Sequence, residues 1–181
     1  MYNMNEILKP TIYCDVDGVL NVYSKDNNLK SVIARRRTPS VGLYLPKVPL
    51  RFKWYENIAN EIVNELAAFV DFKWLTTWND DAVRIIEPLT GIRSSGFLNY
   101  RMRLSEAGSQ VKKYAVLKEH QLLNPSPFIW IDDVATKHYR EEDWTGHHDH
   151  LIIRTNRKLG LTMEHLESMK DFLKSYKLKT I

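Results

Sequence analysis

Short apolar runs alternate along the chain with longer segments whose apolar residues recur every three or four positions. The runs are rich in β-branched and aromatic residues, which predicts strands at residues 11–15, 72–75, 128–131 and 150–153. Helical spacing predicts helices over residues 54–69, 110–122 and 162–176, and a further one between Asn79 and Pro88. Asn79 and Thr162 are the expected N-caps, and Pro88 is expected to stop its helix. This alternation indicates a layered α/β fold.

An insertion follows the first predicted strand. Residues 22–53 are polar and basic, with two strand-like pieces near residues 41–45 and 48–52 and a turn at residues 45–47. We therefore predict a small hairpin there. Because the 181 residues contain no repeat and no Gly/Ser linker, we expect a single domain over residues 1–181 that carries this cap-like insertion.

The composition bears on location and partners. No apolar run approaches the roughly 20 residues that span a bilayer, and the first ten residues lack the apolar stretch of a signal peptide. Cys14 is the single cysteine, so no intrachain disulfide can form, and we expect it to pack in the core. We expect a cytoplasmic protein with no membrane partner and no obligate protein partner. The net charge of +4 permits a polyanionic partner without demanding one.

Polar residues stand where three of the apolar runs end: Asp15, Thr76 and Asp132. In an open parallel sheet, ligands bind beyond the carboxyl ends of the strands. The polar residues therefore fall where chemistry is expected, and this placement carries most of the functional argument.

Asp15 and Asp17 flank Val16 directly after the first strand, so both carboxylates lie on one side of the backbone. Two neighbouring like charges need neutralisation, and Mg²⁺ prefers hard oxygen ligands of this kind. Gly18 allows a sharp turn just after them. The alternative is a solvated turn or a calcium loop, but Val19 and Leu20 stand where a calcium loop needs further ligands.

Three further motifs could serve a phosphate site. A hydroxyl at Thr76, with free N–H groups beyond it, can hold a phosphate oxygen, although it can equally cap the next turn. Lys112 and Lys113 begin a predicted helix and can bring positive charge to phosphate, or can lie on a solvated face. Asp132 and Asp133 end a core strand, where paired carboxylates have no structural role. Paired carboxylates can, however, bind a metal ion.

Taken in order, these motifs resemble the haloacid dehalogenase-like superfamily, whose motifs are Asp-x-Asp, Thr or Ser, Lys, and one or two Asp. The resemblance covers nearly the whole chain and looks closest to the short members associated with RNA repair proteins. The matching segments are residues 15–21 (DVDGVLN), 74–78 (WLTTW), 130–133 (WIDD) and 160–162 (GLT). It implies a three-layer α/β/α Rossmann-like core with a central parallel sheet and a small hairpin insertion after the first strand.

The resemblance also implies roles. Asp15 would attack phosphorus and form an aspartyl phosphate, and Asp17 would protonate the leaving group and then activate water. Thr76 and one of the two lysines would hold the phosphoryl oxygens, and the helix phase does not settle whether this is Lys112 or Lys113. Asp15, Asp132 and the backbone carbonyl of Asp17 would hold Mg²⁺, and Asp133 would support the metal site or bind a metal-bound water.

The presence of Asp17 favours a phosphatase over a dehalogenase, because halide needs no protonation. A small insertion leaves the site open, which suits a nucleotide or polynucleotide end phosphate. The candidate substrate-binding residues are Thr77, Arg35, Arg36 and Arg37. The alternatives are a non-catalytic nucleic-acid-binding or interaction domain on the same fold, a phosphomutase, and a phosphatase of small phosphorylated metabolites.

Overall fold

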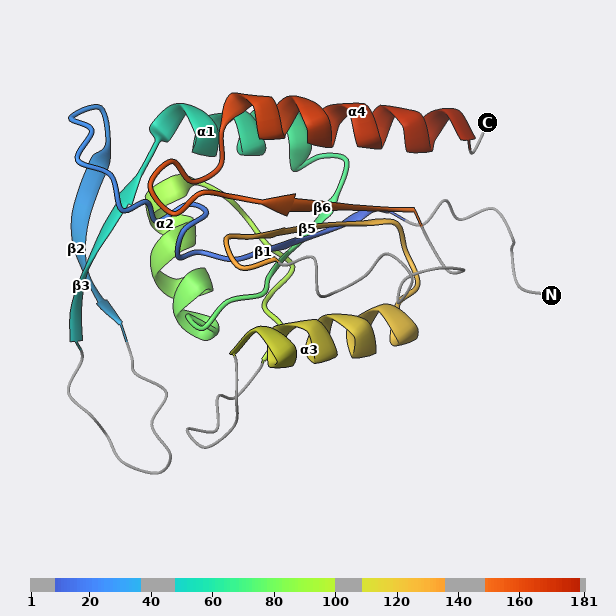
Figure 1. Ribbon diagram of the computed structural model, residues 1–181, viewed down its shortest axis with the longest axis horizontal. Coiled ribbons are helices and arrows are strands. Elements are labelled where there is room, and N and C mark those ends of the chain that lie inside the picture. The colour runs from blue at the N-terminus through green and yellow to red at the C-terminus, as the bar shows by residue number, and fades with distance from the viewer. Residues whose placement is uncertain (1–8, 37–47, 100–108, 136–148, 180–181) are drawn as a thin grey trace.

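The structure is a computed structural model that describes residues 9–36, 48–99, 109–135 and 149–179. Its centre is a four-stranded parallel sheet with the order β4-β1-β5-β6 (Figure 1). The strands are β1 (Thr11–Cys14), β4 (Asp71–Trp74), β5 (Phe128–Asp132) and β6 (His150–Arg154). The predicted parallel sheet is thus confirmed, and its strands lie within one or two residues of the apolar runs.

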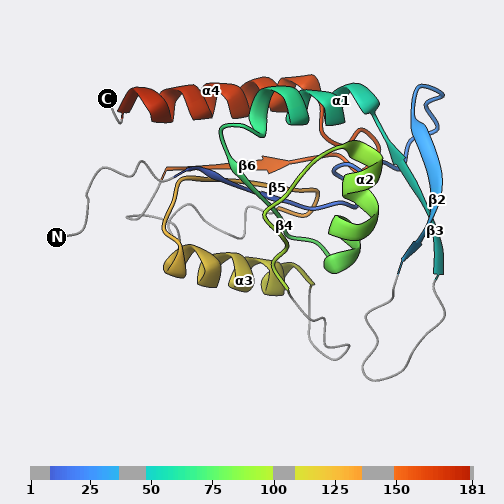
Figure 2. The ribbon, with the colours of Figure 1, turned by 180° about the vertical axis from the view of Figure 1, so that it is seen from behind.

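Helices cover both faces of the sheet, as the two opposite views show (Figures 1 and 2). One face carries α1 (Glu56–Glu61), which continues into the π-helical turn η1 (Ile62–Leu66), together with α4 (Met163–Lys179). The other face carries α3 (Ser109–Leu123). A second π-helical turn, η2 (Ala82–Ile86), leads into α2 (Glu87–Thr90). The predicted three-layer α/β/α architecture is therefore confirmed.

Strand alternation divides the core between the two faces. Ile12 and Cys14 of β1 pack in the larger apolar cluster, with the side chains of α1 and α4. Tyr13 points to the opposite face and packs with Leu117 of α3 and Trp130 of β5. Cys14 is fully buried, as expected, and burial raises the pKa of its thiol.

The insertion forms an antiparallel hairpin from β2 (Lys30–Arg36) and β3 (Val48–Trp54), which lies at the end of the molecule to which the β6 arrow points (Figure 1). The hairpin itself is confirmed, but its first strand precedes the predicted piece at residues 41–45, and that piece and the turn at residues 45–47 lie outside the described residues. Ala34 and Phe52 face the core, whereas Ile33 and Arg51 are exposed. Strand 30–36 buries little apolar area, and so its sequence carries a weak strand signal.

Two predicted helix ends differ from the structure. Pro88 lies inside the helical segment rather than stopping it, because η2 ends at Ile86 and Pro88 falls in the first turn of α2, where a missing N–H costs nothing. Gly91, with φ of 76°, ends the segment. Asn79 precedes the helix but has φ of 47°, and its Oδ1 is buried without a partner among the described residues instead of capping. Thr162 does cap α4, since its Oγ1 accepts from the His165 N–H at 3.4 Å.

Within the described ranges, no helix combines the length and apolarity needed to cross a membrane.

Candidate active site

Three buried carboxylates meet at the carboxyl edge of the sheet. Asp15 follows β1, while Asp132 ends the neighbouring strand β5 and Asp133 comes directly after it. One carboxylate oxygen from each lies within 4.8 Å of the others, and Asp132 is fully buried. The convergence follows from register, because Cys14 pairs with Ile131 across two parallel strands, and the residues that follow them, Asp15 and Asp132, therefore lie side by side.

Lys113 of α3 reaches these acids from the face of the sheet that α3 covers. Its buried ammonium group donates to Asp132 Oδ2 at 2.7 Å and forms a second short ion pair with Asp15 Oδ2. The side chain of Lys112 lies outside the described residues. Lys113 is thus a candidate lysine that lies at the acids.

The charges at this edge favour a further cation. Burial, and then the nearby Asp15 carboxylate, raise the pKa of Asp132 to about 7, although Lys113 works against both effects. The Lys113 ammonium group is thus shared by two buried carboxylates, and the third, that of Asp133, pairs with Arg157, so three carboxylates face two cationic side chains. Hard oxygen donors in this number and proximity fit Mg²⁺, which takes one or two protein carboxylates and keeps other positions for water or phosphate.

Asp17 is held apart from this cluster. Its Oδ2 accepts a hydrogen bond from Trp78 Nε1 at 2.9 Å, and its Oδ1 accepts one from Asn21 Nδ2 at 2.8 Å. The carboxylate of Asp17 is therefore not one of the three clustered acids; in the predicted metal site it would contribute its backbone carbonyl. The two donors fix the position of its carboxylate.

Gly18 makes the turn that brings the backbone of this loop against Asp133. Its φ of 77° is a left-handed conformation that glycine adopts without strain. A Cβ atom at this position would lie 2.7 Å from the Cβ of Asp133. The motif therefore needs glycine for space as well as for conformation.

A cavity of about 240 Å³ opens above the acids. Its lining comprises Asp15, Asp17, Tyr23, Thr77, Lys113, Asp133, Val134 and Arg157. Thr77, predicted to bind substrate, lines it. Thr76 is fully buried, and its hydroxyl accepts from the Trp78 N–H at 3.3 Å.

Of the three arginines predicted in the insertion, the structure describes the side chain of Arg35 alone. Arg35 is exposed on the hairpin and is not among the lining residues, while the side chain of Arg36 and all of Arg37 lie outside the described residues. Arg157 instead supplies the arginine at the cavity. Its Nε forms a short ion pair with Asp133 Oδ2.

Sequence analysis missed Tyr23, Val134 and Arg157, which belong to no motif. One usable signal was Gly160 in the GLT segment. Its φ of 66° and the close contact that any Cβ would make with Val22 show that the loop after β6 must approach the loop after β1. That approach brings Arg157 to the cavity.

A Rossmann-like parallel sheet, a hairpin after its first strand and an aspartate cluster with a lysine at its carboxyl edge define a domain of the haloacid dehalogenase-like class. A model of the family described as the HAD domain in Swiss Army Knife RNA repair proteins matches residues 11–166. The chain belongs to this family. A search of curated proteins finds no match.

Proposed function

We propose that this domain is a Mg²⁺-dependent phosphatase that works through an aspartyl-phosphate intermediate, with Asp15 as the nucleophile. The observation that carries the proposal is that Asp15, Asp17, Thr77 and Lys113 all line one cavity. Together they supply a nucleophile, a proton donor, a hydroxyl and a positive charge for phosphoryl oxygens, and these are the parts that phosphoryl transfer requires.

The reaction has two halves. A carboxylate oxygen of Asp15 bonds to phosphorus as the bond to the leaving oxygen breaks, and Asp17 gives that oxygen its proton. Asp17 then takes a proton from water, whose oxygen bonds to phosphorus as the bond to Asp15 breaks. An alcohol and inorganic phosphate leave, and both aspartates return to their starting states.

Lys113 and Thr77 would hold the phosphoryl oxygens, and the Thr76 hydroxyl stays a predicted third contact. Lys113 also keeps the Asp15 carboxylate in place through its ion pair. Because the ammonium group is buried, its interaction with developing negative charge is little screened by water.

Asp15, Asp132 and Asp133, with the backbone carbonyl of Asp17, would hold Mg²⁺. When bound, the ion neutralises charge on the phosphoryl oxygens. The fit rests on the three clustered carboxylates, which are hard oxygen donors close enough to share one ion.

The substrate we propose is a nucleotide or a polynucleotide end phosphate, supported by the family's place in RNA repair proteins. The predicted contribution of Arg35, Arg36 and Arg37 stays a prediction. We further propose that residues 1–181 form one domain and that the protein works in the cytoplasm.

The test is phosphate release from p-nitrophenyl phosphate with Mg²⁺, with EDTA, and by the Asp15→Asn variant. Activity that requires both Mg²⁺ and Asp15 is the expected result. If the wild type releases phosphate neither from p-nitrophenyl phosphate nor from a 3′-phosphorylated oligonucleotide, the enzyme assignment is overturned in favour of a non-catalytic binding domain.

A further inference from the structure

The cavity is too small for a whole nucleotide. Its volume of about 240 Å³ lies below the roughly 300–1,000 Å³ of pockets that enclose drug-sized ligands. A phosphoryl group fits beside Asp15 and Lys113, but the sugar and base of a nucleotide must lie outside. The identity of the substrate is therefore read by the residues at the rim.

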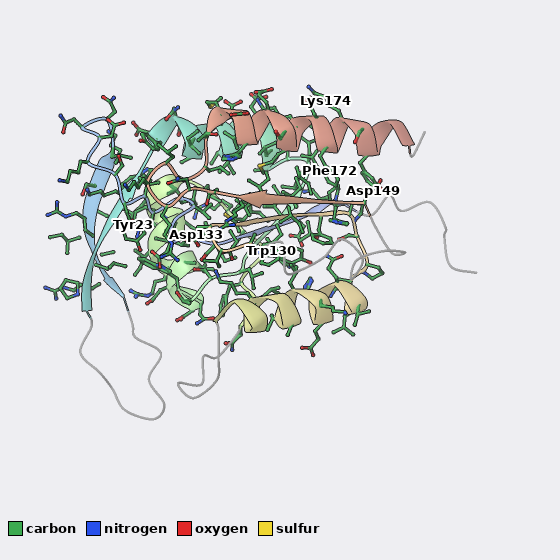
Figure 3. The ribbon with its side chains drawn as sticks, viewed as in Figure 1. Tyr23, Trp130, Asp133, Asp149, Phe172 and Lys174 are labelled. Carbon is green, nitrogen blue, oxygen red and sulfur yellow. The ribbon has the colours of Figure 1, made fainter. Side chains whose placement is uncertain are left out.

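Two rim residues have the chemistry to contact a nucleotide. Tyr23 lines the cavity and yet is 59% exposed. It lies near Asp133 at the carboxyl end of the sheet (Figure 3). Arg157 has a side chain that is 65% exposed although its Nε is paired with Asp133, so most of the side chain is accessible to a ligand.

The backbone fixes these two residues next to each other. The Tyr23 N–H donates to the Arg157 carbonyl at 2.9 Å, and the Val22 N–H donates to the Lys53 carbonyl at 2.9 Å. Val22 is buried against Gly160, where no Cβ would fit. An exposed aromatic ring on a fixed backbone offers a contact surface at low entropic cost.

We propose that Tyr23 and Arg157 form a nucleotide subsite, in which the Tyr23 ring stacks on the base of the nucleotide whose sugar carries the reacting phosphate, and Arg157 binds the next phosphodiester. Every base has a π-face, so stacking tolerates sequence, and a guanidinium group suits phosphate oxygens. The proposal rests on the proposed phosphatase function and adds to it the residues that would select nucleic-acid ends.

The rival surface is the outer face of the hairpin. Arg35 and Arg51 are exposed there, and neither lines the cavity. A nucleic-acid end whose phosphate sits at Asp15 occupies the cavity that Tyr23 and Arg157 also line. Arg51 therefore provides a matched control, since its loss changes the net charge as much as the loss of Arg157.

The experiment compares kcat/KM for a 3′-phosphorylated dinucleotide, a 3′-mononucleotide and p-nitrophenyl phosphate. Tyr23→Ala is expected to lower the ratio of mononucleotide to p-nitrophenyl phosphate by about tenfold, while Tyr23→Phe keeps it because the ring stays. Arg157→Gln is expected to lower the ratio of dinucleotide to mononucleotide by about tenfold. Arg51→Gln is expected to change neither ratio.

Equal losses on all three substrates in Tyr23→Ala would overturn the proposal, as would an Arg51→Gln effect as large as that of Arg157→Gln. Binding separates this failure from a failure of the phosphatase assignment. Fluorescence anisotropy of a labelled 3′-phosphorylated oligonucleotide with the Asp15→Asn variant needs no turnover. Weaker binding by the Asp15→Asn, Tyr23→Ala double variant than by Asp15→Asn alone supports the subsite even if the protein is not a phosphatase. Binding that is unchanged, or undetectable in every variant, overturns the subsite.

Discussion

Trp78 offers the sharpest test of how the proposed proton donor is held. Its indole Nε1 donates to Asp17 Oδ2 at 2.9 Å from a side chain that is almost fully buried. Trp78→Phe removes this donor and keeps most of the aromatic packing. A hydrogen bond to a charged group contributes about 1.5–3 kcal/mol, which corresponds to roughly a 10- to 100-fold loss in kcat/KM if the bond is needed in the transition state.

The loss should depend on the leaving group. An alkyl alcohol needs its proton as the phosphorus–oxygen bond breaks, whereas p-nitrophenolate is stable without one. We therefore expect Trp78→Phe to lose 10- to 100-fold on an alkyl or nucleoside phosphate and only a few-fold on p-nitrophenyl phosphate. The quantity to measure is kcat/KM, because it excludes the second half-reaction that all substrates share.

The control is Trp54→Phe. Trp54 is also a buried tryptophan of the same core, stacked on Phe52 with ring centroids 5.1 Å apart, and it belongs to the hairpin. Trp54→Phe should lower the free energy of unfolding by a similar amount, but any loss in kcat/KM should be equal for the two leaving groups. A Trp78→Phe loss that is equal on both substrates, or a Trp54→Phe profile that matches it, would refute the positioning role of Trp78.

Three further predictions follow from the site. Lys113→Met should reduce phosphatase activity at least 100-fold, because Lys113 contacts both Asp15 and Asp132. Lys112→Met should keep activity within a few-fold of wild type. A larger loss in Lys112→Met than in Lys113→Met would contradict this prediction. In urea unfolding, Gly18→Ala and Gly91→Ala should each lower the free energy of unfolding by about 1 kcal/mol, because both positions have a left-handed backbone. Gly18→Ala should lower it by about 1–3 kcal/mol more, because its new Cβ would meet Asp133, whereas a Cβ at position 91 has room. Equal losses in the two variants would contradict the contact with Asp133. Mg²⁺ at a hundredfold excess over its Kd should raise the free energy of unfolding by about 2.7 kcal/mol relative to EDTA, and a similar gain in Asp132→Asn would count against the proposed ligands.

The sheet and its acids could be predicted because both depend on local patterns. β1 and β5 are buried along their whole length, so each appears in the sequence as a continuous apolar run. β4 lies at the sheet edge and alternates between buried and half-buried positions, which is why it begins at Asp71, one residue before the apolar run. Once parallel order is assumed, the residues after Cys14 and Ile131 must meet.

Other parts of the site depend on contacts between distant segments, which no local pattern encodes. The bond between Trp78 and Asp17 joins residues 61 positions apart, and the pair Arg157–Asp133 joins a loop to a strand end. The choice between Lys112 and Lys113 depended on the phase of α3 relative to the sheet. In each case the residue type gave the possible chemistry, and only the packing gave the partner.

The loop after β1 links the chemistry to the proposed recognition. Asn21 donates its Nδ2–H to Asp17 Oδ1 at 2.8 Å, while its own Oδ1 accepts from the Lys53 N–H at 3.0 Å. One buried amide therefore connects the proposed proton donor to the hairpin. Tyr23 lies two residues further along the same loop. A base that stacks on Tyr23 therefore contacts the same loop whose backbone positions Asp17. A substitution that removes the hydrogen bonds of Asn21 should impair both proton transfer and discrimination between nucleotides and small phosphate esters.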